Sequence, residues 1–420
     1  MGIDKSFDAY IENVCKRIKN KDVHESIKME ISDHLLTMKE EAMNNGLSEE
    51  EAVNQALGHM GDVKVLGNQL NKAHKPEIDY KLILPVIAAS CFGLFVMYYL
   101  QFHSAFTVMQ EMSVFQNSAA FYVLGALLMV SLFVFDYRKL LQYSKQSYIV
   151  TMIILTVTVL FGTKVDGVPF LNLGLLHINF IEMTPFLLAI SFAGIFKNWN
   201  WRDVQKRVYG WGMMSLPVIL LLSTGALSSI ILIIVVCSAV MIVSKASLKQ
   251  VIAFAGAASV YPFLQLVLNP QYYALLDPLT IKLSEIGNGM TATPGLISEV
   301  HTDFILAYML YSFGWVAVMA VVGLIGFLII RLFHVTKRVN SSYEKILVAG
   351  LSAIFATQMI LGLLTNLGLS SLSGVAIPFM SFGGSHIVLE MISVGLLLSV
   401  YRRRKLYNIH QSDLQVSSSR

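Results

Sequence analysis

The sequence predicts an all-α fold: a polytopic membrane protein with about ten transmembrane helices, preceded by a small cytoplasmic helical bundle. Of the 420 residues, 55% are hydrophobic and only 14% are charged, and the mean hydropathy is +0.62. A water-soluble globule of this composition would have too little polar surface to cover its apolar residues. Charged residues also crowd into the first 77 residues and into short loops between long apolar runs.

Residues 1–77 have the pattern of a small helical domain. Apolar residues recur at helical spacing at Ile27, Ile31, Leu35 and Met38. The turn signal Asn44-Asn45-Gly46 ends that helix, and a capping box of Ser48 and Glu51 opens the next one. These signals predict a bundle of three or four helices, which is close to the lower size limit for independent folding.

Apolar runs of membrane-spanning length, separated by short polar loops, begin at Lys81. They predict ten helices near 81–100, 118–135, 147–162, 180–196, 209–224, 226–244, 249–268, 303–330, 346–366 and 382–401. The fifth and sixth are divided only by the weak break Ser223-Thr224-Gly225. Residues 78–405 are therefore expected to form a transmembrane domain and residues 406–420 a cytoplasmic tail. The polar N-terminus predicts that there is no cleavable signal peptide.

Loop charges predict the orientation of these helices. Nearly all Lys and Arg between the apolar runs fall on one side of the predicted membrane, with Arg138, Arg202 and Arg331 among them. Only Lys164 and Lys282 fall on the other side. The positive-inside rule places the richer side in the cytoplasm. An even number of spans then places both termini in the cytoplasm and the start of the eighth helix outside the cell.

Asp303 is the last carboxylate before a long apolar run. An ionisable group at a membrane surface is costly unless it faces a cavity or a partner, which favours a functional role. The alternative is an interfacial helix cap, because Thr302 and Asp303 are ordinary N-terminal residues of a helix. Asp303 also follows the longest predicted extracellular loop, residues 269–302, and loops of that length are usually functional.

Other polar and sulfur-containing residues favour structural roles. Pairing patterns and ligand spacing are absent, so we expect neither a disulfide nor a metal site at Cys15, Cys91, Cys237, His24, His34 and His59. Gln358 and Asn366 lie within an apolar run and are expected to bond neighbouring helices. His386 and Glu390 are four residues apart and could pair with each other. A buried structural pair is favoured there over a proton relay.

Two segments of the N-terminal part resemble a known module. Residues 46–52 read Gly-Leu-Ser-Glu-Glu-Glu-Ala, and residues 56–62 read Ala-Leu-Gly-His-Met-Gly-Asp. Together they resemble the HAAS, or permease-prefix, domain, which precedes membrane proteins of Gram-positive bacteria. The resemblance implies a cytoplasmic interaction or regulatory role for residues 1–77, without chemistry of its own.

Three segments of the apolar part resemble a known family. Residues 301–304 read His-Thr-Asp-Phe, residues 377–385 read Ile-Pro-Phe-Met-Ser-Phe-Gly-Gly-Ser, and residues 395–399 read Gly-Leu-Leu-Leu-Ser. In this order they are similar to the hallmark segments of the SEDS family (FtsW, RodA, SpoVE), and Asn366 matches the family's ninth-helix pattern. The resemblance covers residues 80–405 and implies a ten-span fold with both ends inside.

Members of that family polymerise glycan strands from lipid II, the undecaprenyl-pyrophosphate-linked disaccharide pentapeptide, at the extracellular face of the bacterial plasma membrane. The resemblance implies that Asp303 is the catalytic carboxylate, because a sugar hydroxyl that attacks an anomeric carbon needs a positioned base. It implies substrate-binding roles for His301, Thr302, Glu299, Lys282, Glu182, Asn366, Ser381, Gly383, Gly384 and Ser385.

The same resemblance implies a protein partner and a source of positive charge for the pyrophosphate. The expected protein partner is a class B penicillin-binding protein, which is a transpeptidase, and no nucleic-acid partner is expected. The pyrophosphate leaving group needs stabilisation by cationic side chains or by a divalent cation such as Mg²⁺ or Mn²⁺. No other cofactor is indicated.

Several polar residues typical of the family are replaced in this chain. Pro169-Phe170 stand where an Arg-Trp pair is usual, and the element that contains Glu182 has lost its Lys. Tyr311-Ser312 replace a Glu-Glu pair. These losses keep open a non-catalytic role as a lipid II transporter, or as a scaffold linked to a cytoplasmic partner. An unrelated ion-coupled transporter would need acids at mid-membrane depth, with Glu390 the main candidate.

Overall fold

The computed structural model describes most of the chain, and every structural statement below concerns that part. The described residues are 5–73, 75, 79–103, 113–165, 167–172, 177–268, 301–339, 341–367, 369, 372 and 374–404. The chain divides into two compact units, Asp79–Val400 and a unit of Met1–Ile78 with Tyr401–Arg420. Each unit is described by itself.

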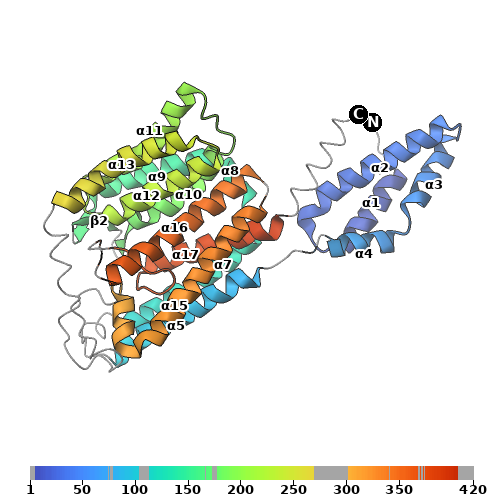
Figure 1. The fold of residues 1–420 in the computed structure, drawn as a ribbon. Helices are drawn as coiled ribbons and strands as arrows, with labels where there is room; N and C mark the ends of the chain where they lie inside the picture. The colour runs from blue at the N-terminus through green and yellow to red at the C-terminus, as the bar shows by residue number, and fades with distance from the viewer. Residues whose placement is uncertain are drawn as a thin grey trace. The chain divides into compact units, whose positions relative to one another are not determined.

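The N-terminal unit is a helical bundle of the kind that the sequence predicts (Figure 1). Its elements are α1 (Lys5–Arg17), the 3-10 turn η1 (Lys21–Val23), α2 (His24–Asn44), α3 (Glu49–Met60) and α4 (Val63–Ala73). Its core consists of buried apolar side chains at Phe7, Ile11, Val14, Ile18, Val23, Ile27, Ile31, Leu35, Val53 and Ala56. The predicted capping box is confirmed, because Ser48 N donates to Glu51 Oε2 at 3.1 Å and Glu51 N donates to Ser48 Oγ at 3.4 Å.

Ten long helices follow from Tyr80 onward in the described residues, and they match the ten predicted apolar runs. They are α5 (Tyr80–Phe102), α7 (Val114–Val134), α9 (Ser144–Phe161), α10 (Phe180–Ile195), α11 (Val204–Leu221), α12 (Leu227–Val243), α13 (Leu248–Leu268), α15 (Ile305–Arg338), α16 (Ser342–Asn366) and α17 (Gly384–Arg403). Among the described helices, seven are long and apolar enough to cross a membrane, while α10 and α12 are apolar but shorter. The predicted polytopic all-α fold is thereby confirmed.

The helix α15 is longer than predicted and is broken near its start. It runs for 34 residues to Arg338, and Gly314 within it has φ 78° and ψ −177°. Such a backbone conformation is open to glycine at little cost and to other residues only with strain. Residues 305–313 therefore form a separate first segment of α15.

A short antiparallel sheet between α9 and α10 was not predicted. Its strands are β1 (Thr163–Val165), β2 (Val168–Asn172) and β3 (His177–Ile178), in the order β1-β2-β3. Lys164 pairs with Pro169 and Leu171 pairs with Ile178. The available signal was the Asp-Gly dipeptide at 166–167, a pair common in hairpin turns.

The helices α16 and α17 lie in the interior of the helix bundle that follows Asp79 (Figure 1). In the most apolar 18-residue stretch of each helix, 61% of α16 and 78% of α17 is buried inside the protein. The helix α16 packs against α10, α12 and α15. Close approach of α17 to α7 depends on glycine, because a Cβ on Gly395 would lie 2.7 Å from the carbonyl oxygen of Met129.

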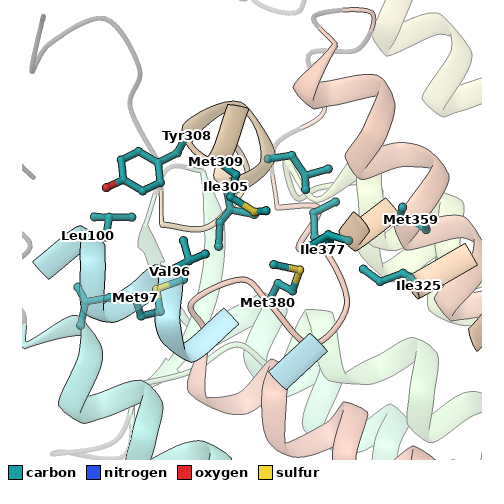
Figure 2. Close-up of a cluster of buried hydrophobic side chains, with 13 residues drawn as sticks. Val96, Met97, Leu100, Ile305, Tyr308, Met309, Ile325, Met359, Ile377 and Met380 are labelled. Carbon is teal, nitrogen blue, oxygen red and sulfur yellow. The ribbon is translucent and has the colours of Figure 1, made fainter. Parts of the chain in front are cut away.

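One hydrophobic cluster fixes the loop that follows α16 against the helices. Figure 2 shows Val96, Met97 and Leu100 of α5 and Ile305, Tyr308 and Met309 of α15 gathered around Ile377 and Met380. Both loop residues are fully buried. The loop is therefore part of the core, and the polar residues next to it have fixed positions.

Candidate active site

Asp303 lies in the turn immediately before α15, and its carboxylate is held by backbone. The side chain is buried, with 6% exposed. Its Oδ2 accepts a hydrogen bond of 2.7 Å from the N–H of Gly374, in the loop after α16. Gly374 has φ +73°, in the left-handed region that glycine adopts without a steric penalty. This donor, a backbone N–H, is uncharged and therefore orients the Asp303 carboxylate without neutralising its charge.

Asn366, the last residue of α16, fixes the main chain of the same turn. Its Nδ2 donates to the carbonyl of Asp303 at 2.8 Å and to the carbonyl of Gly362 at 2.8 Å. Its Oδ1 accepts from Ala307 N at 2.9 Å. Asn366 is buried and bonds the start of α15 and the turn before it, in agreement with the predicted bonding of neighbouring helices.

The loop segment 377–382 is bonded to the same turn from the other side. Ser381 Oγ donates to the carbonyl of Thr302 at 2.9 Å and accepts from Ile377 N at 2.8 Å. Phe382 N donates to the carbonyl of His301 at 2.7 Å, and the rings of His301 and Phe382 lie 5.4 Å apart between centroids. Two of the three hallmark segments, residues 301–304 and 377–385, are therefore bonded to each other.

A cavity of about 220 Å³ opens beside Asp303, where the starts of α10, α12 and α15 meet. Its wall combines the sheet, these three helix starts, the loop after α16 and the first turn of α17. The lining residues are Val168, Phe170, Asn179, Ile181, Glu182, Gly225, Ala226, Ser228, Ser229, Thr302, Asp303, Gly374, Ala376, Phe382, Gly383 and His386.

Three ionisable side chains line this cavity, and none of its described lining residues is Lys or Arg. Glu182 lies in the first turn of α10, where Asn179 caps the helix by accepting from Glu182 N at 3.3 Å. A Cβ built on Gly374 would lie 3.7 Å from Glu182 Oε1. Gly374 is thus close to both carboxylates, and Asp303, Glu182 and His386 are near enough to interact electrostatically.

The predicted pair of His386 and Glu390 is confirmed. His386 Nε2 lies 2.8 Å from Glu390 Oε1, and both side chains are buried. Glu390 Oε2 also accepts from Phe379 N at 2.7 Å. Phe379 has φ +62°, a strained conformation for a residue other than glycine, and its carbonyl accepts from Tyr122 Oη at 2.7 Å. Glu390 therefore anchors the loop as well as the imidazole.

The remaining predicted site residues that the structure describes either line the cavity or lie outside its lining. Thr302, Glu182 and Gly383 line the cavity with Asp303, whereas His301, Asn366 and Ser381 support the turn and do not line it. Gly384 packs against Phe121, and Ser385 lies in the first turn of α17, outside the lining. Glu299 and Lys282 lie outside the described residues.

Several lining residues were not singled out from the sequence. Asn179, Ser228 and Ser229 carry no charge and sit at the starts of apolar helices. The usable signal was the run Ser223 to Ser229, in which small polar residues interrupt an apolar stretch. Gly374 had a similar signal, because a glycine in a polar loop favours positive φ.

The described residues do not by themselves build a metal centre. No group of three or more His, Cys, Asp and Glu among them could hold a metal ion. The cavity supplies two carboxylates, Asp303 and Glu182, and one imidazole. A divalent cation would therefore need oxygens of a substrate to complete its coordination, as magnesium commonly does with phosphates.

Comparison with known proteins gives this arrangement a family. A family model described as "Cell cycle protein", covering FtsW, RodA and SpoVE, matches residues 80–282 and 284–406. A protein of Thioalkalivibrio sulfidiphilus named "Probable peptidoglycan glycosyltransferase FtsW" is 25% identical over 373 residues, which cover 80% of this chain and 92% of the relative. The Bacillus subtilis protein of that name is 35% identical over 106 residues, 25% of this chain and 26% of the relative.

Some of the alignments are short. The alignment to the Thiomicrospira cyclica protein of the same name spans only 39% of the length of that relative.

Solved structures share the fold. The rod shape determining protein RodA of Thermus thermophilus matches with a TM-score of 0.61 and 21% identity, over 78% of this chain and 97% of that chain. A chain from "Structural coordination of polymerization and crosslinking by a peptidoglycan synthase complex" has a TM-score of 0.65 and 19% identity, over 78% and 98%. Because the family model matches most of its length, this chain belongs to the FtsW/RodA/SpoVE family.

Proposed function

We propose that this protein is a peptidoglycan glycosyltransferase that polymerises lipid II into glycan strands, with Asp303 as the general base. The observation that carries the proposal is the buried Asp303 carboxylate, which lines a cavity at one end of an apolar helix bundle and is oriented by Gly374 N. A lipid-linked sugar must be reached at such an end, where apolar and polar environments meet. The names of the relatives support the same activity.

The proposed reaction forms one bond and breaks one. The 4-hydroxyl oxygen of the acceptor sugar bonds to the anomeric carbon of the donor, while the bond from that carbon to the phosphate oxygen breaks. The pyrophosphate leaves with its lipid and keeps the electron pair. Asp303 takes the hydroxyl proton and afterwards releases it to water. Because Gly374 fixes the carboxylate, little reorganisation is needed when the proton moves.

The other predicted site residues have distinct proposed roles. Thr302, Glu182 and Gly383 contact the substrate from the cavity wall, and Gly383 leaves room for it. His301, Asn366, Ser381, Gly384 and Ser385 contribute by holding the turn and the first turn of α17 in place. Substrate contacts by Glu299 and Lys282 remain predictions about residues outside the described part of the chain.

A divalent cation remains a proposal of the same kind. Asp303 and Glu182, together with pyrophosphate oxygens, would hold Mg²⁺ or Mn²⁺, which would supply positive charge to the leaving group. Titration of EDTA and then of each metal into the polymerisation assay decides this. Activity that is unchanged at saturating EDTA rules the cation out.

The proposed setting is the bacterial plasma membrane, with both termini in the cytoplasm and Asp303 on the outer side. The sequence-based expectation that Arg138, Arg202 and Arg331 lie on the side opposite Asp303 supports this orientation. The N-terminal bundle is proposed to be a HAAS-type domain for a cytoplasmic partner, supported by the Ser48–Glu51 capping box in its motif. The proposed extracytoplasmic partner is a class B penicillin-binding protein, because one fold neighbour comes from a peptidoglycan synthase complex.

The test is polymerisation of lipid II by the purified full chain, with and without a class B penicillin-binding protein. Asp303→Asn keeps the volume of the side chain and an oxygen for Gly374 N, and removes the base. We expect polymer formation to fall by about 100-fold or more. Asp203→Asn is the matched control, because Asp203 is a helix N-cap where Asn serves equally well. Equal yields from wild type and Asp303→Asn would contradict the proposal.

A non-catalytic role as a lipid II transporter or scaffold is the second candidate. It is favoured by one observation, the absence of Lys and Arg among the described lining residues. In cells that depend on this protein, it predicts that Asp303→Asn supports normal growth while deletion of residues 1–77 resembles the null. The glycosyltransferase predicts the null phenotype for Asp303→Asn.

A further inference from the structure

His386 is the only lining residue of the described cavity wall that can carry a positive charge. It lies in the first turn of α17 and shares the cavity lining with two carboxylates, Asp303 and Glu182. Without a bound cation between them, both carboxylates would repel a pyrophosphate brought into this cavity. A cationic or hydrogen-bond-donating group is therefore needed on the same wall.

One nitrogen of His386 is already committed to the protein. Nε2 lies 2.8 Å from Glu390 Oε1, and 3.5 Å from Gln358 Nε2. Glu390 is fully buried and is itself fixed through Phe379 N. A carboxylate at this distance orients an imidazole and acts as a counter-ion for its protonated form.

The other nitrogen, Nδ1, is buried and has no hydrogen-bond partner among the described residues. The whole side chain is only 5% exposed, although it lines the cavity. A buried polar atom without a partner costs about 1–3 kcal/mol. A polar group that enters the cavity and bonds Nδ1 would remove this cost.

We propose that His386, oriented by Glu390, binds a phosphate oxygen of the lipid pyrophosphate through Nδ1–H. The inference rests on the proposed function and names a substrate contact within the same site. The protonated imidazole forms an ion pair with Glu390 on its Nε2 side and donates Nδ1–H to the phosphate. When the bond to the anomeric carbon breaks, the electron pair stays on the pyrophosphate and His386 keeps its proton.

Binding is measured in nanodiscs with undecaprenyl pyrophosphate as the probe and undecaprenol as the probe without phosphate. Wild-type protein is expected to bind the pyrophosphate more tightly than the alcohol. His386→Gln is expected to weaken pyrophosphate binding tenfold or more and to leave the alcohol unchanged. His334→Gln is the matched control, because His334 is exposed on α15, and it should bind both probes like wild type.

The variant Glu390→Gln separates the effect of Glu390 on the His386 imidazole from its effect on folding. The amide oxygen still accepts from Phe379 N, so the loop stays anchored, but the negative charge beside His386 is lost. We expect pyrophosphate binding to weaken about tenfold at an unchanged thermal midpoint. A purely structural Glu390 would leave binding as it is.

The outcomes are separable from those of the proposed function. Asp303→Asn should lower polymerisation by about 100-fold or more while pyrophosphate binding is kept. A wild-type protein that never polymerises lipid II, but binds the pyrophosphate in a His386-dependent way, overturns the glycosyltransferase and supports this site. Wild-type binding by His386→Gln overturns the site whatever the activity. If that variant fails to fold, wild-type binding by Glu390→Gln overturns it instead.

Discussion

The backbone N–H of Gly374 donates to Asp303 Oδ2 at 2.7 Å, across 71 residues of sequence. Gly374 reaches this position with φ +73°, and a Cβ placed on it would lie 3.7 Å from Glu182 Oε1. The loop after α16 therefore bonds one carboxylate of the cavity through a glycine that lies close to the other. The position of the proposed base depends on a conformation that other residues adopt only with strain.

Gly374→Ala is expected to lower polymerisation about tenfold with little change in lipid II binding. There is space for the methyl group, so the effect comes from the left-handed backbone, which costs a non-glycine residue about 1–2 kcal/mol and displaces the N–H. The readout is kcat against KM for lipid II. Gly256→Ala is the control, because Gly256 is helical and its added Cβ would meet open space. A loss in both variants would point to general destabilisation.

Asn366→Ala is expected to destabilise the protein by about 1–3 kcal/mol, because Ala307 N and the carbonyl of Asp303 lose a buried partner. Polymerisation should fall as well, since the turn that carries Asp303 loosens. Thermal unfolding in detergent and the polymerisation assay measure the two effects. Asn200→Ala, at an exposed loop position, is the control. If Asn366→Ala unfolds at the wild-type temperature, Asn366 does not stabilise the turn that carries Asp303.

The helices could be predicted because their signals are local. Length and composition of the apolar runs gave all ten long helices of the described part, and Ser48 with Glu51 gave the start of α3. Boundaries were less accurate where a helix continues into polar residues, as α15 does to Arg338. A hydropathy pattern ends where charge begins, although the helix does not.

The cavity could not be predicted in the same way, because it depends on contacts distant in sequence. The hallmark segments singled out Asp303, Thr302 and Gly383, and these line the cavity. Nothing local indicated that Gly374 N would bind the carboxylate, or that Glu390 would bond Phe379 N. Such bonds follow from how helices pack, which periodicity does not encode.

Glu51→Ala is expected to destabilise α3 at neutral pH. The hydrogen bonds from Ser48 lower the pKa of the Glu51 carboxyl, so its contribution to stability is present above the pKa of the unfolded chain, about 4.3. That contribution is lost as the pH falls through the lower folded pKa. Hydrogen exchange of α3 amides in the full chain measures the effect at pH 7 and at pH 3.5. Glu50→Ala controls for the charge in the first turn of the helix, and equal effects of the two variants would argue against the capping box.

Gly384→Ala is expected to destabilise the protein, whereas Gly383→Ala is not. A Cβ on Gly384 would lie 2.3 Å from the ring of Phe121, but on Gly383 its nearest neighbour would be His386 Cβ at 3.5 Å. Overpacking of this kind costs about 1–3 kcal/mol, so the midpoint of thermal unfolding should fall for Gly384→Ala alone. Phe121→Ala is itself destabilising, so a double-mutant cycle is needed: Gly384→Ala should cost less stability in the Phe121→Ala background than in wild type, because the clashing ring is gone. If Gly384→Ala costs the same stability in both backgrounds, the ring contact is not the cause. In that case Gly384 is needed for the backbone conformation at the start of α17.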